Sequence, residues 1–219
     1  MVRVLIADDH EVVRRGVRQI LQEYLPDVNL GEATSGEAAL EQVQNHEWDL
    51  VILDLGLPGK SGLEVLKQLR EAYPRLPVLV LSMYPEVQYA VRVLRAGAAG
   101  YVTKETASED LLKAVLKVLH GGKYVSALLA EKLALDLELH TQGPPHEALS
   151  DREYEVMLKI AAGSSVKEIA YQLGLSAKTV STYRERILLK MKMKTNADLT
   201  YYAIRNNLID WNQEKPRPS

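Results

Sequence analysis

The chain has 219 residues, of which 47% are hydrophobic, so it can hold one large or two ordinary domains with a real core. It has no cysteine, which excludes disulfides, a thiol nucleophile and a cysteine-ligated metal. Residues 149–219 carry 12 Lys and Arg against 8 Asp and Glu, whereas residues 1–148 carry 15 against 21. An acidic first part and a basic second part indicate two domains, the second suited to a polyanion.

The hydrophobic runs of the chain are all short. None approaches the roughly 18 residues that a membrane span needs, and the run after Met1 is too short for a signal peptide. We therefore expect a soluble, cytoplasmic protein without membrane contact.

Strands and helices are expected to alternate through the first 120 residues. Short apolar runs predict strands at 2–7, 28–33, 49–54, 77–81 and 99–102. Amphipathic spacing predicts helices after His10, at 36–45, from Ser61, at 86–95 and from Thr106 to about His120, the first with Val13, Val17, Ile20, Leu21 and Tyr24. Ser61–Glu64 and Thr106–Glu109 have the capping-box pattern. The pattern predicts an α/β domain with a five-stranded parallel sheet, covered on both faces, in the flavodoxin-like order 2-1-3-4-5.

Side chains suited to phosphoryl transfer stand at the carboxyl ends of these strands. Asp8 and Asp9 follow the first strand, and Asp54 follows the third, its neighbour in the sheet. Three carboxylates so close repel one another unless a cation intervenes, and hard oxygen ligands suit Mg²⁺. Ser82 and Lys104 end the fourth and fifth strands, where a hydroxyl and an ammonium would neutralise and position a phosphoryl group. This arrangement predicts Asp54 as a nucleophile beside a Mg²⁺ site.

Each of these residues also has an ordinary structural explanation. Asp8 or Asp9 can cap the following helix, Ser82 can be a turn hydroxyl, and Lys104 can be a solvated charge. His10 is expected only to begin the helix. The joint occurrence of five suitable residues at one edge of the sheet favours the functional interpretation.

Residues 1–122 resemble the receiver domains of two-component response regulators. The residues that carry the resemblance are Asp8-Asp9, Asp54 in Asp54-Leu-Gly-Leu-Pro58, Gly62, Ser82, Tyr101 and Lys104. The resemblance implies that Asp54 accepts a phosphoryl group from a sensor histidine kinase. It also implies that Asp9, Asp54 and the backbone carbonyl of Gly56 bind Mg²⁺, with Asp8 acting through water. Ser82 and Tyr101 would then be the switch residues, and Glu105 departs from the family, where many members have a proline.

A linker is expected at residues 123–148. A helix from Ser126 would carry Leu129, Leu133 and Leu137 on one stripe, which could equally face a partner. Gly143, Pro144 and Pro145 then interrupt regular structure and mark the domain boundary.

Residues 149–211 are predicted to form an all-α domain of four short helices. Helix starts are expected at Ser150, Ser165, Ser176 and Thr195. A helix that ends at Gly174, a tight turn and a further helix in a basic domain predict a helix-turn-helix. Residues 212–219 are expected to be a disordered tail.

The third of these helices separates into an apolar and a polar face. Val180, Ile187, Leu188 and Met191 are expected in the core. Short polar side chains near the amino end are suited to base edges in the major groove, namely those of Lys178, Ser181, Thr182 and Glu185. The expected phosphate contacts are Lys167, Thr179, Tyr183, Arg184, Arg186, Lys190, Lys192 and Lys194. The alternative is an ordinary solvated helix face.

Residues 149–209 are similar to the LuxR-type helix-turn-helix of NarL/FixJ-like response regulators. The similarity rests on Leu149-Ser-Asp-Arg-Glu153, Glu168-Ile-Ala170, Leu173-Gly-Leu-Ser176, Lys178-Thr-Val180 and Ile187 through Lys190. It implies that 177–191 is the recognition helix. It also makes the last helix, 196–207 with Leu199, Tyr202 and Ala203, a dimer-contact candidate. Glu185 stands where some relatives have a basic residue.

The two resemblances together predict a phosphorylation-controlled transcription regulator. Its expected partners are a sensor histidine kinase, double-stranded DNA, a second copy of the chain when phosphorylated, and RNA polymerase as a further candidate. The first rival is a Mg²⁺-dependent phosphohydrolase, against which Gly56 speaks because such enzymes usually have an acid/base Asp there. A flavin-binding domain is a second rival, although Asp8-Asp9 would repel a flavin phosphate. A protein- or RNA-binding role of the basic domain is the third.

Overall fold

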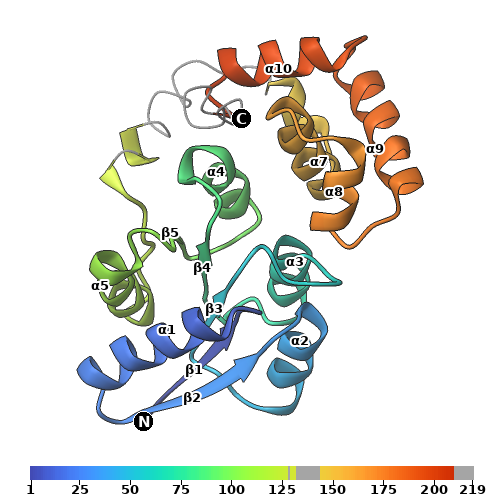
Figure 1. The fold of residues 1–219 in the computed structure, drawn as a ribbon. Helices are drawn as coiled ribbons and strands as arrows, with labels where there is room; N and C mark the ends of the chain where they lie inside the picture. The colour runs from blue at the N-terminus through green and yellow to red at the C-terminus, as the bar shows by residue number, and fades with distance from the viewer. Residues whose placement is uncertain (128, 132–143, 210–219) are drawn as a thin grey trace, which may run out of the picture. The chain divides into compact units, whose positions relative to one another are not determined.

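The computed structural model describes residues 1–127, 129–131 and 144–209, and the chain forms two compact units, Met1–Asp136 and Leu137–Ser219. Strands and helices alternate through the first unit (Figure 1). The strands are β1 (Val2–Ala7), β2 (Val28–Ala33), β3 (Leu50–Leu53), β4 (Val78–Ser82) and β5 (Gly100–Thr103). The helices are α1 (Glu11–Tyr24), α2 (Gly36–Asn45), α3 (Gly62–Ala72), α4 (Glu86–Arg95) and α5 (Ala107–Leu119).

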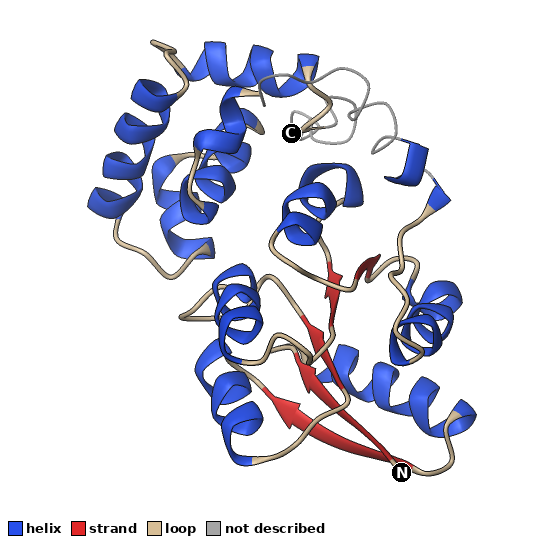
Figure 2. Cartoon of the chain, turned by 180° about the vertical axis from the view of Figure 1, so that it is seen from behind, coloured by secondary structure: helices blue, strands red, loops and turns tan. Residues whose placement is uncertain are grey.

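The five strands form one parallel sheet in the order β2-β1-β3-β4-β5, as predicted. Helices α1 and α5 cover one face, and α2, α3 and α4 cover the other (Figures 1 and 2). Because both faces are covered, the whole of β3 is buried. Ile52 of β3 packs with Val17 of α1 and Leu111 of α5 in one core. In the part of the chain that the structure describes, no helix is long and apolar enough to cross a membrane.

Two details of the first unit differ from the prediction. The capping box at Thr106 is absent, because the Thr106 hydroxyl lies 3.1 Å from the Thr103 hydroxyl in the preceding turn and does not cap α5. Thr106 also lacks the extended backbone of a normal cap, with φ −95° and ψ 3°. Tyr24, expected on the apolar stripe of α1, is 57% exposed because it is the last residue of that helix.

The segment that follows α5 packs on the edge of the sheet. The Tyr124 amide donates to the Ala99 carbonyl at 2.9 Å, and Tyr124 forms a parallel bridge with Gly100. Gly100 permits this approach, since a Cβ there would lie 2.7 Å from the Tyr124 carbonyl oxygen. Leu129 is buried, as a stripe of the linker helix would require. The rest of that stripe, the residues that include Gly143, and the expected tail at 212–219 lie outside the described residues.

The second unit consists of helices in the region that the structure describes. These are η1 (Pro145–Ala148), α7 (Asp151–Ala161), α8 (Val166–Gln172), α9 (Ala177–Lys190) and α10 (Asn196–Arg205). Capping boxes begin α7, α8 and α10, and the Ser176 hydroxyl caps α9. Gly174, with φ of 64°, forms the turn between α8 and α9. The second unit therefore has the predicted helix-turn-helix.

Helix α10 corrects the expected dimer contact. Leu199 and Ala203 are fully buried, because α10 packs these side chains against α7. The Tyr202 hydroxyl lies 2.7 Å from His146 Nδ1 within the same unit. These residues form the interior of the unit, so a dimer contact through α10 would have to use exposed residues such as Tyr201.

Candidate functional site

The backbone ladder places two acidic residues side by side just beyond the strands. The Asp54 amide donates to the Ala7 carbonyl at 2.8 Å, and the Asp8 amide donates to the Ala33 carbonyl at 3.0 Å. The pairing of neighbouring parallel strands therefore continues one residue past β1 and β3. Both side chains are almost completely buried, with 2% exposure for Asp8 and 4% for Asp54.

Lys104 bridges the two buried carboxylates. Its Nζ lies 2.7 Å from Asp8 Oδ2 and 2.7 Å from Asp54 Oδ2, and its side chain is 5% exposed. Burial raises the pKa of Asp54 above its ordinary value, and the Lys104 ammonium only partly offsets this. Burial acts to lower the pKa of Lys104, but the charges of Asp54 and Asp8 outweigh it and raise that pKa. The site is therefore a tightly coupled group of buried charges.

The acidic cluster has the composition of a site for a hard cation. One ligand atom from each of Asp8, Asp9, His10 and Asp54 lies within 4.8 Å of the others. Asp8 Oδ2 is buried and makes no hydrogen bond, although the Lys104 ammonium lies beside it as an ion-pair partner. His10 Nδ1 is 2.7 Å from Asp9 Oδ1, and the His10 amide donates to Asp8 Oδ1 at 2.9 Å. Three carboxylates against one buried ammonium leave negative charge that a divalent cation would neutralise.

Two glycines behave differently in the loop after Asp54. A Cβ on Gly56 would make an ordinary contact of 3.5 Å with Asp54 Oδ2. A Cβ on Gly62 would lie 2.0 Å from the Asp54 carbonyl oxygen and 2.7 Å from Leu55 Cα. The Gly62 amide also donates to the Leu55 carbonyl at 3.1 Å. Gly62 is thus required for the loop to fold back onto Asp54, whereas Gly56 is not required by packing.

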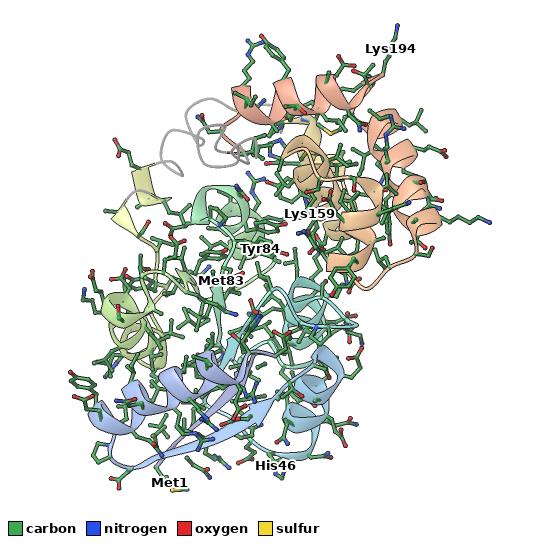
Figure 3. The ribbon with its side chains drawn as sticks, in the orientation of Figure 1. Met1, His46, Met83, Tyr84, Lys159 and Lys194 are labelled. Atoms are coloured by element: carbon green, nitrogen blue, oxygen red, sulfur yellow. The ribbon has the colours of Figure 1, made fainter. Side chains whose placement is uncertain are left out.

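Ser82 is the last residue of β4, which pairs with β3, and Tyr101 is the second residue of β5, the next strand in the sheet. Ser82 is fully buried, and its Oγ accepts a hydrogen bond from the Tyr84 amide at 3.3 Å. Tyr101 is 1% exposed, and its hydroxyl donates to the Tyr84 carbonyl at 2.7 Å. Burial raises the pKa of the Tyr101 hydroxyl. The backbone of Tyr84, a residue labelled in Figure 3, therefore contacts both predicted switch residues from the loop between β4 and α4.

The first turn of α4 is tied to the start of the linker. The Ser126 hydroxyl donates to Glu86 Oε2 at 2.6 Å and accepts from the Leu129 amide at 3.0 Å. One hydroxyl thus caps the turn that follows Ser126 and holds the first residue of α4. Sequence reasoning missed this contact, because the two residues are 40 positions apart.

Glu105 has no unusual backbone geometry. No peptide bond among the described residues is cis, so Lys104 reaches the two carboxylates with a trans bond to Glu105. The Glu105 side chain is exposed. The departure from proline at this position therefore leaves the Lys104 contacts intact.

Helix α9 presents the predicted polar face. Lys178, Thr182 and Glu185 are exposed, and Ser181 is half-buried. The Ser181 hydroxyl donates to the Ala177 carbonyl at 3.0 Å, and the Thr182 hydroxyl donates to the Lys178 carbonyl at 3.1 Å. With their protons used in this way, both hydroxyl oxygens remain acceptors for the amino groups of bases. Val180, Ile187 and Met191 are buried as predicted, whereas Leu188 is only partly buried.

Three of the expected phosphate contacts already have side-chain partners, among them Thr179, whose hydroxyl lies 2.8 Å from that of Ser176. Lys190 Nζ lies 2.6 Å from Oε2 of Glu153, a residue that is 3% exposed. Arg184 Nε donates to Asn196 Oδ1 at 2.7 Å. Both contacts hold α9 within its unit. The other expected phosphate residues with exposed side chains are Lys167, Arg186, Lys192 and Lys194, while Tyr183 and Thr179 are half-buried.

Sequence reasoning identified Glu153 only as a capping residue. Its carboxylate accepts from the Ser150 amide at 2.7 Å and also binds Lys190. Burial acts to raise the pKa of Glu153, but the Lys190 hydrogen bond and the Ser150 bonds lower it overall. No local signal indicates the partner, because the pair joins the first turn of α7 to the end of α9 across 37 positions.

Two family models match the chain. The response regulator receiver domain matches residues 4–116, which is more than half of the chain. The luxR family of bacterial regulatory proteins matches residues 147–203. The first match contains the carboxyl edge of the sheet, and the second contains the helix-turn-helix.

Curated relatives match along nearly the whole chain. The response regulator UvrY of Escherichia coli (strain K12) is 36% identical over 211 residues, which cover 96% of this chain and 97% of UvrY. The response regulator GacA of Pseudomonas aeruginosa is 35% identical over 211 residues, covering 96% of this chain and 99% of GacA.

The RcsB response regulator of Salmonella enterica serovar Typhimurium is a structural neighbour. Its structure bound to promoter rprA in the presence of the phosphomimetic BeF3⁻ has a TM-score of 0.64 and 31% identity, and the match covers 92% of this chain and 97% of RcsB. A further RcsB structure of Salmonella typhimurium has a TM-score of 0.68 and 30% identity, covering 94% and 98%. Order of domains and fold are therefore shared over almost the full length.

Proposed function

The chain belongs to the response regulators of the NarL/FixJ type, which join a receiver domain to a LuxR-type DNA-binding domain, and we propose the following roles for its residues. It is a DNA-binding transcription regulator controlled by phosphorylation. The observation that carries the proposal is the Lys104 ammonium, which lies 2.7 Å from both buried carboxylates. Such a group neutralises charge where a phosphoryl group would arrive.

Asp54 is the phosphoacceptor. An Asp54 carboxylate oxygen forms the new bond to phosphorus, and the phosphorus–nitrogen bond of a phosphohistidine on the sensor kinase breaks. Lys104 neutralises the equatorial oxygens, and Ser82 donates its hydroxyl proton to one of them. Ser82 would give up its present contact with the Tyr84 amide to do so. Tyr101 is already buried behind the site and needs no large inward movement.

Mg²⁺ is the cation that the cluster would hold. Asp9, Asp54 and the Gly56 backbone carbonyl supply oxygen ligands, and Asp8 acts through water. The excess of hard oxygen donors over the single Lys104 ammonium supports this assignment. When bound, Mg²⁺ supplies charge neutralisation for the phosphoryl oxygens. His10 stays outside the ligand set, because Mg²⁺ prefers oxygen to nitrogen ligands.

The signal travels from Asp54 through the loop between β4 and α4. Tyr84 contacts both Ser82 and Tyr101 through its backbone. Two residues further on, Glu86 holds the Ser126 hydroxyl that caps the start of the linker. A movement of this loop would alter the linker cap and thereby the freedom of the DNA-binding domain to pair on two half-sites.

The second domain reads DNA through α9. Lys178, Ser181, Thr182 and Glu185 contact bases, with Glu185 placed to accept from a cytosine amino group. Lys167, Thr179, Tyr183, Arg186, Lys192 and Lys194 contact phosphates, whereas Lys190 and Arg184 would first have to leave Glu153 and Asn196. RcsB bound to promoter DNA supports this role. Homodimerisation on phosphorylation follows from the two half-sites, and RNA polymerase is a further partner.

The chain acts as a phosphoacceptor, and its only chemistry is self-phosphorylation and autodephosphorylation. The rival is a Mg²⁺-dependent phosphohydrolase with an Asp54 intermediate. Such an enzyme needs an acid/base group near Asp54, but Gly56 occupies that position and offers none. Repeated turnover of small phosphate esters, measured as inorganic phosphate released per chain, would favour the rival.

The domain limits that we propose are 1–122 for the receiver, 123–148 for the linker, 149–211 for the DNA-binding domain and 212–219 for the tail. A protein that binds the chromosome of a bacterium works in the cytoplasm, which is where we place this chain.

Intact-mass measurement tests the proposal. Wild-type protein treated with acetyl phosphate and Mg²⁺ should gain the mass of one phosphoryl group, located in the peptide that contains Asp54. Asp54→Asn should gain none, while the control Asp110→Asn, which changes a carboxylate outside the acidic cluster, should behave as wild type. Labelling of Asp54→Asn at the wild-type level would refute Asp54 as the acceptor.

A further inference from the structure

An arginine on α1 reaches back to the loop that carries the acidic pair. Arg14 NH1 donates to the Asp8 carbonyl oxygen at 2.9 Å, and Arg14 Nε donates to Glu32 Oε2 at 2.9 Å. The Arg14 side chain is only 11% exposed. One guanidinium therefore connects α1, β2 and the residue that follows β1.

Glu32 fixes the orientation of this guanidinium. Its second carboxylate oxygen, Oε1, accepts from Arg18, one turn further along α1. The hydrogen bonds of Arg14 and Arg18 lower the pKa of Glu32, so the carboxylate stays ionised. Because a guanidinium is planar with donors in a fixed fork, the Glu32 contact at Nε sets the direction in which NH1 points.

The Arg14 side chain bonds to the backbone between the two acidic residues Asp8 and Asp9. Strand β1 ends at Ala7, and the Asp8 amide is already bonded to Ala33. The Arg14 bond to the Asp8 carbonyl fixes the next peptide, which joins Asp8 to Asp9. Both carboxylate side chains leave the backbone on either side of that peptide. Its orientation therefore determines where both carboxylates point.

We propose that Arg14, aligned by Glu32, is a positioning residue for the divalent-cation site of Asp8, Asp9 and Asp54. It acts through the Asp8–Asp9 peptide and touches neither the cation nor the phosphoryl group. The inference rests on the proposed function, since that function requires a cation at these carboxylates. Supporting contacts around metal ligands typically change affinity by about 10–100-fold when they are removed.

The test uses Mn²⁺ as an observable divalent probe of the full-length chain. Free Mn²⁺ is followed by electron paramagnetic resonance while each variant is titrated. Arg14→Met should weaken Mn²⁺ binding by about 10–100-fold. Arg14→Lys keeps the charge but cannot donate to both oxygens in the same geometry, so it should also weaken binding. Glu32→Gln should shift affinity in the same direction by a smaller factor.

Arg18→Met is the matched control. Arg18 binds the same Glu32 carboxylate from the same helix but has no contact with the Asp8 carbonyl. It should leave Mn²⁺ affinity close to that of wild type. Urea unfolding of each variant separates a change in affinity from a general loss of stability. At saturating Mn²⁺ the labelling rate of Arg14→Lys by acetyl phosphate should return towards wild type, because only cation affinity has been changed.

The outcomes separate the inference from the function on which it rests. If wild type binds Mn²⁺ and Arg14→Met and Arg14→Lys bind it equally well, Arg14 does not position the site, and the proposed function stands. Equal losses of Mn²⁺ affinity in Arg14→Met and Arg18→Met would also overturn the positioning role, because they would show a general effect of disturbing α1. If wild type takes up no Mn²⁺ at all, the cation site itself is wrong and both ideas are overturned.

Discussion

The carboxyl edge of the sheet, where we propose phosphorylation, and the polar face of α9, where we propose DNA binding, are built in opposite ways. At the sheet edge Asp8, Asp54 and Lys104 are nearly inaccessible, and one ammonium contacts both carboxylates at 2.7 Å. On α9 the side chains of Lys178, Thr182 and Glu185 are exposed, and the Ser181 and Thr182 hydroxyls donate to carbonyls of their own helix.

This difference determines how each region responds to change. In the buried cluster every charge is paired with another. The loss of one member therefore leaves a buried charge unpaired and lowers the unfolding free energy by a large amount. On the exposed helix water and salt screen each charge, so single losses are small and nearly additive. Substitutions in the two regions should therefore differ in the size of their effects.

Lys104→Met should have the largest effect. It leaves Asp8 and Asp54 facing each other without a cation, which is expected to cost about 3–5 kcal/mol of unfolding free energy without divalent metal. Without the Lys104 ammonium the pKa of the Asp54 carboxyl rises further above its ordinary value, so its protonated form is favoured in the fold. The deficit relative to wild type should therefore grow as pH rises from about 4 to 8.

Urea unfolding of the full chain across this pH range measures the effect of Lys104→Met. The control is Lys113→Met, since Lys113 is 69% exposed and pairs with Asp110 only at 3.4 Å. That variant should change the unfolding free energy by less than about 1 kcal/mol. Similar small losses of unfolding free energy in both variants would contradict the idea that burial determines how much each ion pair contributes.

Gly62→Ala should come next. The added Cβ would lie 2.0 Å from the Asp54 carbonyl, so the loop must shift, at an expected cost of about 1–3 kcal/mol. Acetyl phosphate labelling of Asp54 should slow in parallel. Gly16→Ala is the control, because a Cβ there meets nothing within 4 Å and α1 should gain up to about 1 kcal/mol. A neutral Gly62→Ala would show that the loop does not hold Asp54.

Glu153→Gln tests the ion pair by which the buried Glu153 carboxylate of α7 holds Lys190 at the end of α9. Lys190 is 41% exposed at its side chain, so screening limits the expected loss to about 1 kcal/mol at pH 7. Because the pKa of Glu153 is lowered in the fold, its contribution exists above the ordinary value of 4.5 and fades as pH falls below it. Thermal unfolding of wild type and variant should therefore converge at low pH, and a gap that widens in acid would oppose this assignment.

Lys194→Ala should have the smallest effect. Its side chain extends away from the unit (Figure 3). One lost phosphate contact should weaken DNA binding by less than about tenfold for all sequences and reduce the slope of log affinity against log salt by roughly 1. Glu185→Gln is the contrasting variant, because it should change base preference more than the salt slope. An unchanged slope in Lys194→Ala would remove it from the phosphate contacts.

The residues at the carboxyl edge of the sheet were predicted correctly, because the order of the strands determines which residues meet there. Once strands 2–7 and 49–54 are neighbours in a parallel sheet, Asp8 and Asp54 must meet at one edge, and Lys104 arrives from a strand on the same edge. The hydrophobic pattern fixes these positions without knowledge of side-chain rotamers.

Contacts that a side chain on a helix makes with another element were not predictable in this way. The bonds from Arg14 to the Asp8 carbonyl and from Lys190 to Glu153 depend on how a helix is rotated about its axis. The failed cap at Thr106 has a local cause, since the neighbouring Thr103 hydroxyl competes for the same side chain. Of the residues that the resemblance offered as dimer contacts on α10, Leu199 and Ala203 are buried within the unit, which the resemblance alone does not reveal.

The central claim is that a phosphoryl group on Asp54 controls DNA binding by α9. Fluorescence anisotropy with a duplex selected from random DNA measures it directly, for wild type and Asp54→Asn, with and without acetyl phosphate and Mg²⁺. Wild type should gain affinity by a factor of roughly 5–150, the usual range of coupling between two sites, and Asp54→Asn should gain none. An equal gain in Asp54→Asn, or no gain in wild type that carries the phosphoryl group, would contradict the account.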